Sequence, residues 1–170
     1  MLNTKLDVFS GKDLSHQYSP DTRGIAKGFF GSVCWSLDGK FFYAGKGPWV
    51  PFIIRKWKEG GKGEYKDFAA AEHYLTDLLP LKDGGVAFSS AFPSFGIFDT
   101  NDKKIVDVSP PIADYRWAPK EFLVSKNGDK IKFCYERFGK SPARFSVIER
   151  SIKTYPALEL DLWPPVTQAP

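Results

Sequence analysis

Three turn dipeptides, spaced at a nearly constant interval, constrain the fold of this chain more than any other feature. Asp38-Gly39, Asp83-Gly84 and Asn127-Gly128 place their glycines 45 and 44 residues apart. Asp-Gly and Asn-Gly favour tight hairpin turns because they accept the positive φ angles that such turns require. Residues typical of strands flank each dipeptide, at 33–37, 77–81 and 122–125 before the turns and at 40–44, 86–90 and 130–135 after them. The spacing therefore predicts one hairpin in each of three repeats.

Each hairpin is followed by further strand-like residues. A third strand is predicted at 52–57, 95–99 and 144–149, and a weaker fourth at 64–68, 104–108 and 151–155. The chain opens with segments of the third and fourth kind, 5–10 and 14–18, so we predict half a unit followed by three full units. The stretch 66–79 contains no Gly or Pro and is long enough for a helix. Two of the three repeats have nothing like it, so we interpret it as a fourth strand and a connecting loop.

A repeat of about 44 residues with four strands is typical of β-propeller blades. A twisted four-stranded sheet cannot bury both faces alone and has to stack on its neighbours, and the 15 Phe, 7 Tyr and 5 Trp residues suit the space between sheets. The 15 Gly and 13 Pro residues exclude a coiled coil or a helical bundle. The predicted fold is all-β, a propeller segment of about 3.5 four-stranded blades. The blades are predicted at 1–20 (partial), 28–70, 71–109 and 110–155, with a Pro-rich tail or linker at 156–170.

The repeats resemble WD40 repeats over residues 5–155. Each unit has a strand, an Asx-Gly turn and a second strand, and its third strand ends near Trp57-Lys58, Phe98-Asp99 or Ile148-Glu149, where the family has Trp-Asp. No unit has Trp-Asp itself, and none opens with the usual Gly-His, to which Glu72-His73 comes nearest. The resemblance implies a WD40-like β-propeller, but the family's buried Asp–His–Ser hydrogen-bond network does not carry over.

A narrower resemblance is to the propeller region of bacterial proteins that join a caspase-like peptidase domain to WD40 repeats. It rests on the stretches 78–84 (LLPLKDG), 95–99 (FGIFD) and 138–145 (FGKSPARF). The peptidase's His and Cys lie in a separate domain of those proteins, and nothing in this chain matches that domain. The resemblance therefore implies an interaction platform rather than a protease.

An open stack of blades leaves apolar sheet faces and unpaired strand edges in water. The chain is then either part of a larger propeller or closes with a partner. Two copies would supply seven blades, the commonest ring of the family it resembles, and the first two strands of one chain would complete a blade of the other. We therefore predict a protein partner, in the first place a second copy that forms a homodimer, and expect the open edge at 5–18 to be needed for it.

The loops between second and third strands carry Pro and aromatic residues in all three units, at 47–51, 92–94 and 138–142. In a propeller these loops share one face with the loops that join successive blades. Exposed aromatic and Arg side chains on rigid loops are typical of protein-binding hot spots. We predict partner contacts at six residues of this face, Arg23, Trp49, His73, Phe92, Arg116 and Lys140. The alternative is that Trp49 and Phe92 pack under their own blades.

Two other functions stay open from the sequence. Trp49 and other loop aromatics suit stacking on a sugar, as in a carbohydrate-binding propeller. A propeller enzyme with its site in the central channel needs polar side chains on the first strands, for which Asp77 and Asp114 are candidates. Gly139-Lys140-Ser141 resembles the end of a phosphate-binding loop, but the motif needs Gly where Cys134 stands. We therefore predict a non-catalytic protein with no cofactor.

The remaining polar residues favour structural explanations. The two His and two Cys residues lack metal-ligand spacing, so no metal site is predicted, and Cys34 and Cys134 are interpreted as buried free thiols. The net charge of +4 and the alternating charges of the basic run 56–67 indicate a solvated hairpin tip rather than a nucleic-acid site. The chain has no apolar run of membrane length and no apolar core of a signal peptide near its first residue, so we expect a cytoplasmic protein that does not enter a membrane.

Overall fold

The computed structural model describes residues 5–25, 29–47, 50–91, 94–108, 123–125, 130–134, 142–146 and 151–154. These residues form three four-stranded antiparallel sheets, one two-stranded sheet and a turn of 3-10 helix, η1 (Glu59–Gly61). The strands are β1 (Val8–Phe9) and β2 (His16–Tyr18); β3 (Phe30–Trp35), β4 (Phe42–Lys46), β5 (Ile53–Trp57) and β6 (Tyr65–Ala69); β7 (Leu75–Pro80), β8 (Val86–Ser90), β9 (Ser94–Phe98) and β10 (Lys104–Val108); and β11 (Leu123–Val124), β12 (Lys130–Cys134), β13 (Pro142–Ser146) and β14 (Ser151–Thr154). Within each sheet the strands pair in chain order, so the predicted all-β fold with repeated four-stranded sheets is confirmed.

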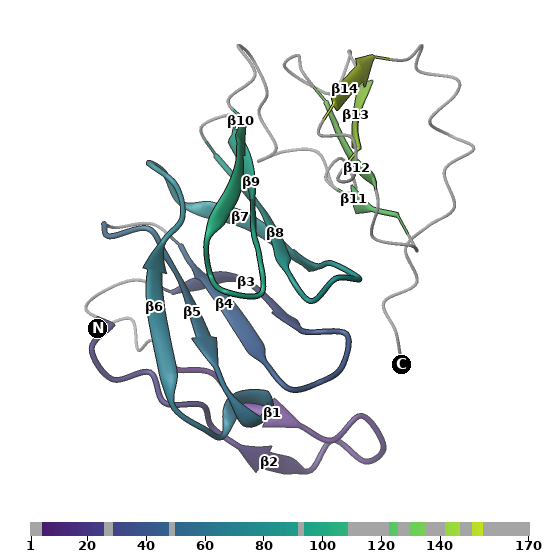
Figure 1. The fold of residues 1–170 in the computed structure, drawn as a ribbon. Helices are drawn as coiled ribbons and strands as arrows, with labels where there is room; N and C mark the ends of the chain where they lie inside the picture. The colour runs from purple at the N-terminus through teal and green to yellow at the C-terminus, as the bar shows by residue number, and fades with distance from the viewer. Residues whose placement is uncertain are drawn as a thin grey trace.

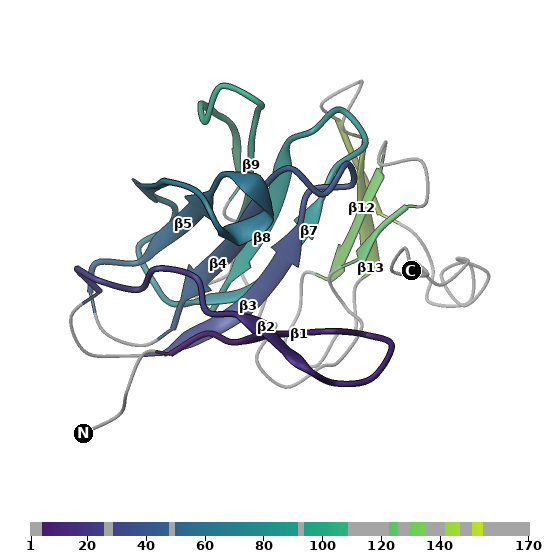
Figure 2. The same cartoon turned by 90° about the horizontal axis from the view of Figure 1, so that it is seen from below.

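The sheets follow one another through the molecule (Figure 1). Figures 1 and 2 both place the β1–β2 hairpin beside the β3–β6 sheet, on the side away from β7–β10. The β11–β14 sheet lies at the opposite end from the hairpin (Figure 1). The half unit that opens the sequence is therefore an end layer, with the β3–β6 sheet on one side only.

The hairpin turns form where the glycines take conformations that other residues rarely adopt. Gly39 has φ +70° and Gly84 has φ +89°. The amide of Ser36 donates to the carbonyl of Phe41 at 2.9 Å and closes the first of these loops. Both hairpins are where the sequence predicts them. The third dipeptide, Asn127-Gly128, lies outside the described residues, as does the predicted tail at 156–170, but the flanking strands β11 and β12 pair antiparallel.

Apolar side chains fill each space between successive sheets. Between β3–β6 and β7–β10 the core holds Tyr43, Ile54, Ala70, Leu75, Leu78, Val86, Phe88 and Phe98. Between β7–β10 and β11–β14 it holds Leu81, Ala87, Phe95, Ile97, Val106, Val124 and Ile131. A smaller cluster of Phe42, Ala44 and Trp57, with Leu6 against it, lies under the N-terminal segment. The sheets thus stack on one another, as the aromatic composition predicts.

The first strands β3 and β7 approach each other closely at Gly31. A Cβ atom at Gly31 would lie 2.7 Å from the carbonyl oxygen of Leu75, so this contact requires glycine. Beside it, the hydroxyl of Ser32 donates to Oδ1 of Asp77 at 3.0 Å and accepts the amide of Leu78 at 2.9 Å. Ser32 and Asp77 are 45 residues apart, so this bond joins the same position of two successive repeats.

The interpretation of the basic run as a solvated hairpin tip is wrong for Lys56. Its side chain is only 9% exposed, and its Nζ lies 2.6 Å from Oδ1 of Asp102 in the next sheet. The same Nζ lies 4.1 Å from the ring centroid of Phe41. Lys58 and Lys66 are exposed as expected. Alternating charge along the chain does not reveal the burial of Lys56, because its carboxylate partner comes 46 residues later.

Candidate interaction face

An exposed apolar surface follows the first strand of the β3–β6 sheet. Val33, Trp35 and Leu37 are 44%, 41% and 55% exposed, whereas the intervening Cys34 is partly buried. Alternate residues of a strand lie on the same face of its sheet, so Val33 and Trp35 point the same way and Leu37 continues the alternation into the turn. We call these three residues, Val33, Trp35 and Leu37, the β3 row.

The β3 row continues a face that is buried farther across the same sheet. Trp35 pairs with Phe42, and Phe42 pairs with Trp57, so the three rings share one face. Exposure falls along this line from 41% at Trp35 to 2% at Phe42 and 0% at Trp57. Leu6 packs against the Phe42 and Trp57 cluster. The N-terminal segment (5–25) therefore covers the middle of this face and leaves its first strand open.

The later repeats provide an internal control for the β3 row. Val33 and Leu78 stand at the same distance before their turn dipeptides, but Val33 is 44% exposed and Leu78 only 1%. Leu78 is buried because it packs with Tyr43 of the preceding sheet. In the same way, Trp35 is 41% exposed and its counterpart Val124 is 3% exposed. Among the described residues, the layer before the β3 row has two strands where the other sheets have four, and the row is open for that reason.

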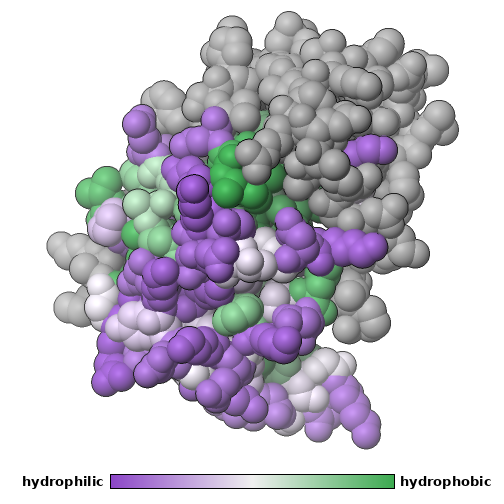
Figure 3. Space-filling view, viewed as in Figure 1, coloured by the Kyte–Doolittle hydropathy of each residue, from purple (hydrophilic) through white to green (hydrophobic). Residues whose placement is uncertain are grey.

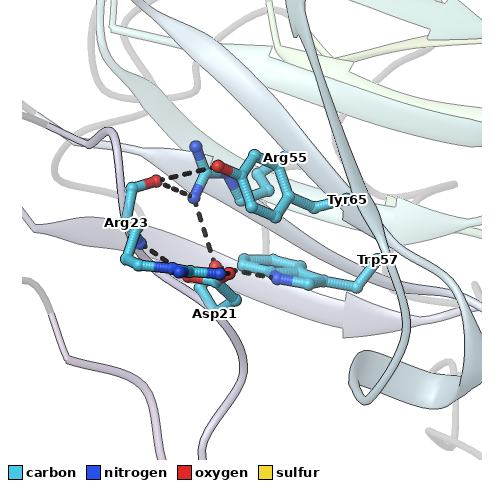
Figure 4. A network of polar contacts seen from close by, with 5 residues as sticks. All are labelled: Asp21, Arg23, Arg55, Trp57 and Tyr65. Carbon is cyan, nitrogen blue, oxygen red and sulfur yellow. Dashed lines mark hydrogen bonds and ion pairs between the residues drawn. The ribbon is translucent and has the colours of Figure 1, made fainter.

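Arg55 fastens the N-terminal segment across β5 and β6 (Figure 4). Its side chain is 1% exposed, and its Nη1 donates to the carbonyl oxygens of Asp21 at 3.2 Å and Arg23 at 2.8 Å. The indole Nε1 of Trp57 donates to the carbonyl of Asp21 at 2.9 Å, and the hydroxyl of Tyr65 donates to that of Arg23 at 3.2 Å. Four hydrogen bonds therefore hold two backbone carbonyls of the loop between β2 and β3.

The buried charge of Arg55 is balanced within the sheet. Asp67 on β6 accepts from Nε at 2.6 Å and from Nη2 at 2.7 Å, a two-pronged ion pair. The guanidinium carbon also lies 3.7 Å from the ring centroid of Tyr65. Sequence reasoning missed Arg55, because the loop carbonyls that cover it come from more than 30 residues earlier in the chain. The only signal in the sequence is the carboxylate of Asp67, which follows 12 residues later on the next predicted strand.

The carbonyl oxygen of Gly60 fixes both the hairpin and the β3 row. The hydroxyl of Tyr18 in β2 donates to it at 2.6 Å, and the indole Nε1 of Trp35 donates to it at 3.2 Å. Trp35 also lies 4.5 Å from the ring of Phe42, centroid to centroid. The Trp35 ring is therefore held rigidly in place while 41% of the residue stays exposed.

Of the six predicted contact residues, Arg23 and His73 lie in the described part of the chain, and Trp49, Phe92, Arg116 and Lys140 lie outside it. The Arg23 side chain is 88% exposed and pairs with Asp21 at 2.6 Å, and its hydrogen bonds lower the pKa of Asp21 to about 2. The ring of His73, in the loop between β6 and β7, stacks on Phe52 with centroids 5.6 Å apart. Both residues lie in loops that join two sheets, and their contact with a partner stays a prediction.

The described polar groups near the first strands have little reactive character. Burial, with the nearby Asp77 carboxylate, raises the pKa of the Cys34 thiol to about 12, so the thiol is protonated at neutral pH. Burial also raises the pKa of Asp77, against the hydrogen bonds from Ser32 and the Leu78 amide. The part of the chain that the structure describes holds no group of three or more His, Cys, Asp or Glu side chains placed to share a metal ion. None of its helical residues forms a segment long and apolar enough to cross a membrane.

The surface seen in the direction of Figure 1 is mainly polar. Hydrophilic residues cover most of the described part in this view, and hydrophobic residues show only as separate patches (Figure 3). Single exposed apolar residues are normal on a protein surface, whereas large contiguous apolar patches mark interaction sites.

By sequence, the chain matches no protein-family profile and no curated protein. By structure, it is similar to U3-55K, with a TM-score of 0.67 and 12% identity over 90% of this chain and 46% of that one. It is also similar to Kuenenia stuttgartiensis hydrazine synthase, with a TM-score of 0.65 and 11% identity over 89% of this chain and 43% of that one. A catalytically inactive virginiamycin B lyase from Staphylococcus aureus gives a TM-score of 0.60 and 16% identity over 89% of this chain and 44% of that one.

These similar structures have propeller-type folds, so the chain has a propeller-like fold. At such low identities the likeness concerns the fold alone. The chain spans less than half the length of each of the three proteins. Because one of them is named a lyase and another a synthase, the fold is compatible with both binding and enzymatic roles.

Proposed function

We propose that this chain is a non-catalytic interaction module, a β-propeller segment of the WD40 type that binds protein through the β3 row. The partner is a second copy of the chain, in a homodimer that completes a ring of seven blades. The observation that carries this proposal is the exposure of Val33, whose counterpart Leu78 is buried, and of Trp35, whose counterparts are partly buried at Pro80 and buried at Val124. The same row would be covered in the same way if the chain were part of a larger propeller.

The β3 row has the physical character of a binding hot spot. Burial of apolar surface contributes roughly 25 cal/mol per Å² to association. Trp is enriched among the residues that dominate binding energies. Trp35 is already fixed by the Gly60 carbonyl and the Phe42 ring, so little side-chain entropy is lost when a partner covers it. A two-fold dimer requires a surface that complements itself, and an apolar row meets that requirement.

A catalytic role has less support from the described residues. Asp77 is the one carboxyl on the described first strands β3, β7 and β11, and its Oδ1 already accepts from Ser32 and from the Leu78 amide. Cys34 is a protonated thiol with a raised pKa. The two residues lie near each other, but the Asp77 carboxylate raises the pKa of the Cys34 thiol rather than lowering it, which is the opposite of what an activated nucleophile needs.

Light scattering on the full chain across a range of concentrations tests the proposal. We expect a dimer that dissociates on dilution and that Val33→Lys weakens, because the new charge lies in the row. Thr100→Lys is the matched control, since Thr100 is exposed in the turn between β9 and β10, outside the row and outside the loops predicted to bind a partner. Deletion of residues 1–20 should also abolish the dimer. A folded monomer at all concentrations, or equal effects of the two Lys variants, would overturn the proposal.

A further inference from the structure

The strand β1 has a free edge where the matching strands of the complete sheets have none. β5, β9 and β13 are third strands, and each pairs on one side with a second strand and on the other with a fourth. β1 precedes β2 as a third strand precedes a fourth, but it pairs with β2 alone. In the described part of the chain, the backbone groups on the other side of β1 therefore have no strand to pair with.

The free edge of β1 and the β3 row adjoin the same space. The N-terminal segment packs on β4 and β5 through Leu6 and through the bonds from Arg55, and it leaves Val33 and Trp35 of β3 44% and 41% exposed. In a complete blade the second and first strands would lie between β1 and that uncovered surface. In the described part of the chain this blade is two strands short of a full one, and the β1–β2 hairpin of a second copy would supply two.

We propose that β1 pairs with β1 of a second copy, so that two hairpins form one four-stranded sheet in the order β2–β1–β1–β2. This inference rests on the proposed function and names the surface that carries it. The hairpin of each copy then extends the half blade of the other and lies over its β3 row. Backbone hydrogen bonds along the shared edge set how the two strands are aligned, and the β3 row supplies the apolar surface that is buried on pairing.

The hairpin is equipped for this role in two ways. Phe9 and Leu14 are 54% and 78% exposed, so the hairpin presents apolar side chains of its own. Leu14 has φ +57°, an uncommon conformation for a residue with a side chain, and keeps it at the exposed tip of the turn. The bond from Tyr18 to Gly60 and those to Asp21 hold the hairpin against its sheet, so the free edge is presented in a fixed position.

Amide hydrogen exchange on the unmodified chain tests the pairing directly. Exchange of the peptide 5–10 is measured at concentrations where light scattering gives monomer and where it gives dimer. We expect the β1 amides to exchange at least about tenfold more slowly in the dimer, because they become hydrogen-bonded in a sheet. The peptide that contains β10, on a sheet far from the shared edge, is the internal control and should exchange at the same rate in both.

Cross-linking gives a second measurement. Phe9→Cys, treated with a short bis-maleimide, should give a covalent dimer, because paired strands bring equivalent residues close to the two-fold axis. Lys103→Cys is the matched control, since Lys103 is exposed in the turn between β9 and β10. If the dimer forms but β1 exchange is unchanged and Phe9→Cys cross-links no better than the control, the strand pairing is overturned while the interaction module stands. If light scattering shows no dimer, both are overturned.

Discussion

Replacement of Asp102 by glycine tests how two neighbouring blades are joined. Asp102 lies in the turn between β9 and β10, and its two carboxylate oxygens accept from two lysines of the preceding sheet. Oδ1 lies 2.6 Å from Nζ of Lys56, and Oδ2 lies 3.1 Å from Nζ of Lys66. The two lysines differ in burial, with 9% of the Lys56 side chain exposed and 63% of that of Lys66. Because Asp102 has φ +63°, glycine fits the same backbone without strain.

The expected loss of stability follows from the burial of Lys56. When one partner of a buried ion pair is removed, the remaining charge stays in the interior, at a cost of about 3–5 kcal/mol. The side chains of Lys56 and Asp102 are 9% and 14% exposed, so water reaches the pair to a small extent, and the Phe41 ring still faces the ammonium after the substitution. We therefore expect a loss at the lower end of this range, about 3 kcal/mol. In a chain of this size each kcal/mol lowers Tm by about 2–4 °C, so thermal unfolding should shift down by about 6–12 °C.

Two further variants separate the pair from the turn. Lys66→Ala removes only an exposed ion pair and should cost at most about 1 kcal/mol. Asp102→Gly combined with Lys56→Met removes the buried charge as well and should recover most of the lost stability. If Asp102→Gly lowers Tm no more than Lys66→Ala does, or if Lys56→Met gives no recovery, the reasoning about the buried pair is refuted.

Three other variants test buried polar groups. Arg55→Lys keeps the charge but loses the two-pronged bond to Asp67 and the bonds to the loop carbonyls, so limited proteolysis should cut the N-terminal segment faster. Burial raises the pKa of Asp77, so the folded state binds its proton more tightly than the unfolded state and loses stability as the pH rises through that pKa. Asp77→Asn keeps an oxygen that accepts from Ser32 and carries no charge, so it should raise Tm at neutral pH. Thermal melts near pH 4 should show this gain disappear. Burial lowers the pKa of Lys46, which is 2% exposed, so its positive charge destabilises the folded state below that pKa. Lys46→Met should therefore raise Tm at neutral pH, and the rise in Tm should shrink as the pH approaches about 10.4.

The strands could be predicted from the sequence because their signals are local. β8 (Val86–Ser90) and β10 (Lys104–Val108) have the bounds that the pattern of apolar residues and the Asx-Gly turn predict. Strands bounded by Pro or by bulges shifted by two or three residues. β3 (Phe30–Trp35) starts three residues before its predicted start at 33, and β13 (Pro142–Ser146) starts two before 144 and ends three before 149. The turn and the period determine each hairpin by themselves, so no knowledge of the packing is needed.

The buried charges could not be predicted, because their partners come from other repeats. Arg55 and Lys56 are neighbours in one strand and point to opposite faces of the sheet. Arg55 is buried under the N-terminal loop, and Lys56 under the turn that contains Asp102. In the sequence Lys56 opens the run of alternating charge at 56–67, which is typical of a solvated hairpin, and Arg55 stands directly before it. Only the stacking of sheets distinguishes these two residues from Lys58, which is exposed.

The open face could be predicted in outline but not by residue. The count of strands alone predicts a half unit, and a half unit implies an uncovered surface. Val33 and Leu78 occupy equivalent positions and are both apolar, so the sequence gives no reason to expect 44% exposure at one and 1% at the other. The difference comes from the layer that precedes each sheet. Among the described residues, two strands precede the sheet of Val33 and four precede the sheet of Leu78.

The polar bonds between sheets reproduce the same period as the turns. Ser32 bonds to Asp77 across 45 residues, Lys56 to Asp102 across 46, and Tyr18 to the Gly60 carbonyl across 42. The bond from Ser32 to Asp77 joins equivalent positions of two repeats, and the other two join neighbouring sheets at a similar separation, so all three contribute to how successive sheets are stacked. The bond that involves the hairpin, from the Tyr18 hydroxyl, goes to the Gly60 carbonyl, which also accepts from the indole of Trp35. The packing of the β1–β2 hairpin and the orientation of the exposed Trp35 ring therefore depend on the same carbonyl. A substitution that displaces the hairpin should change the orientation of Trp35 in the β3 row.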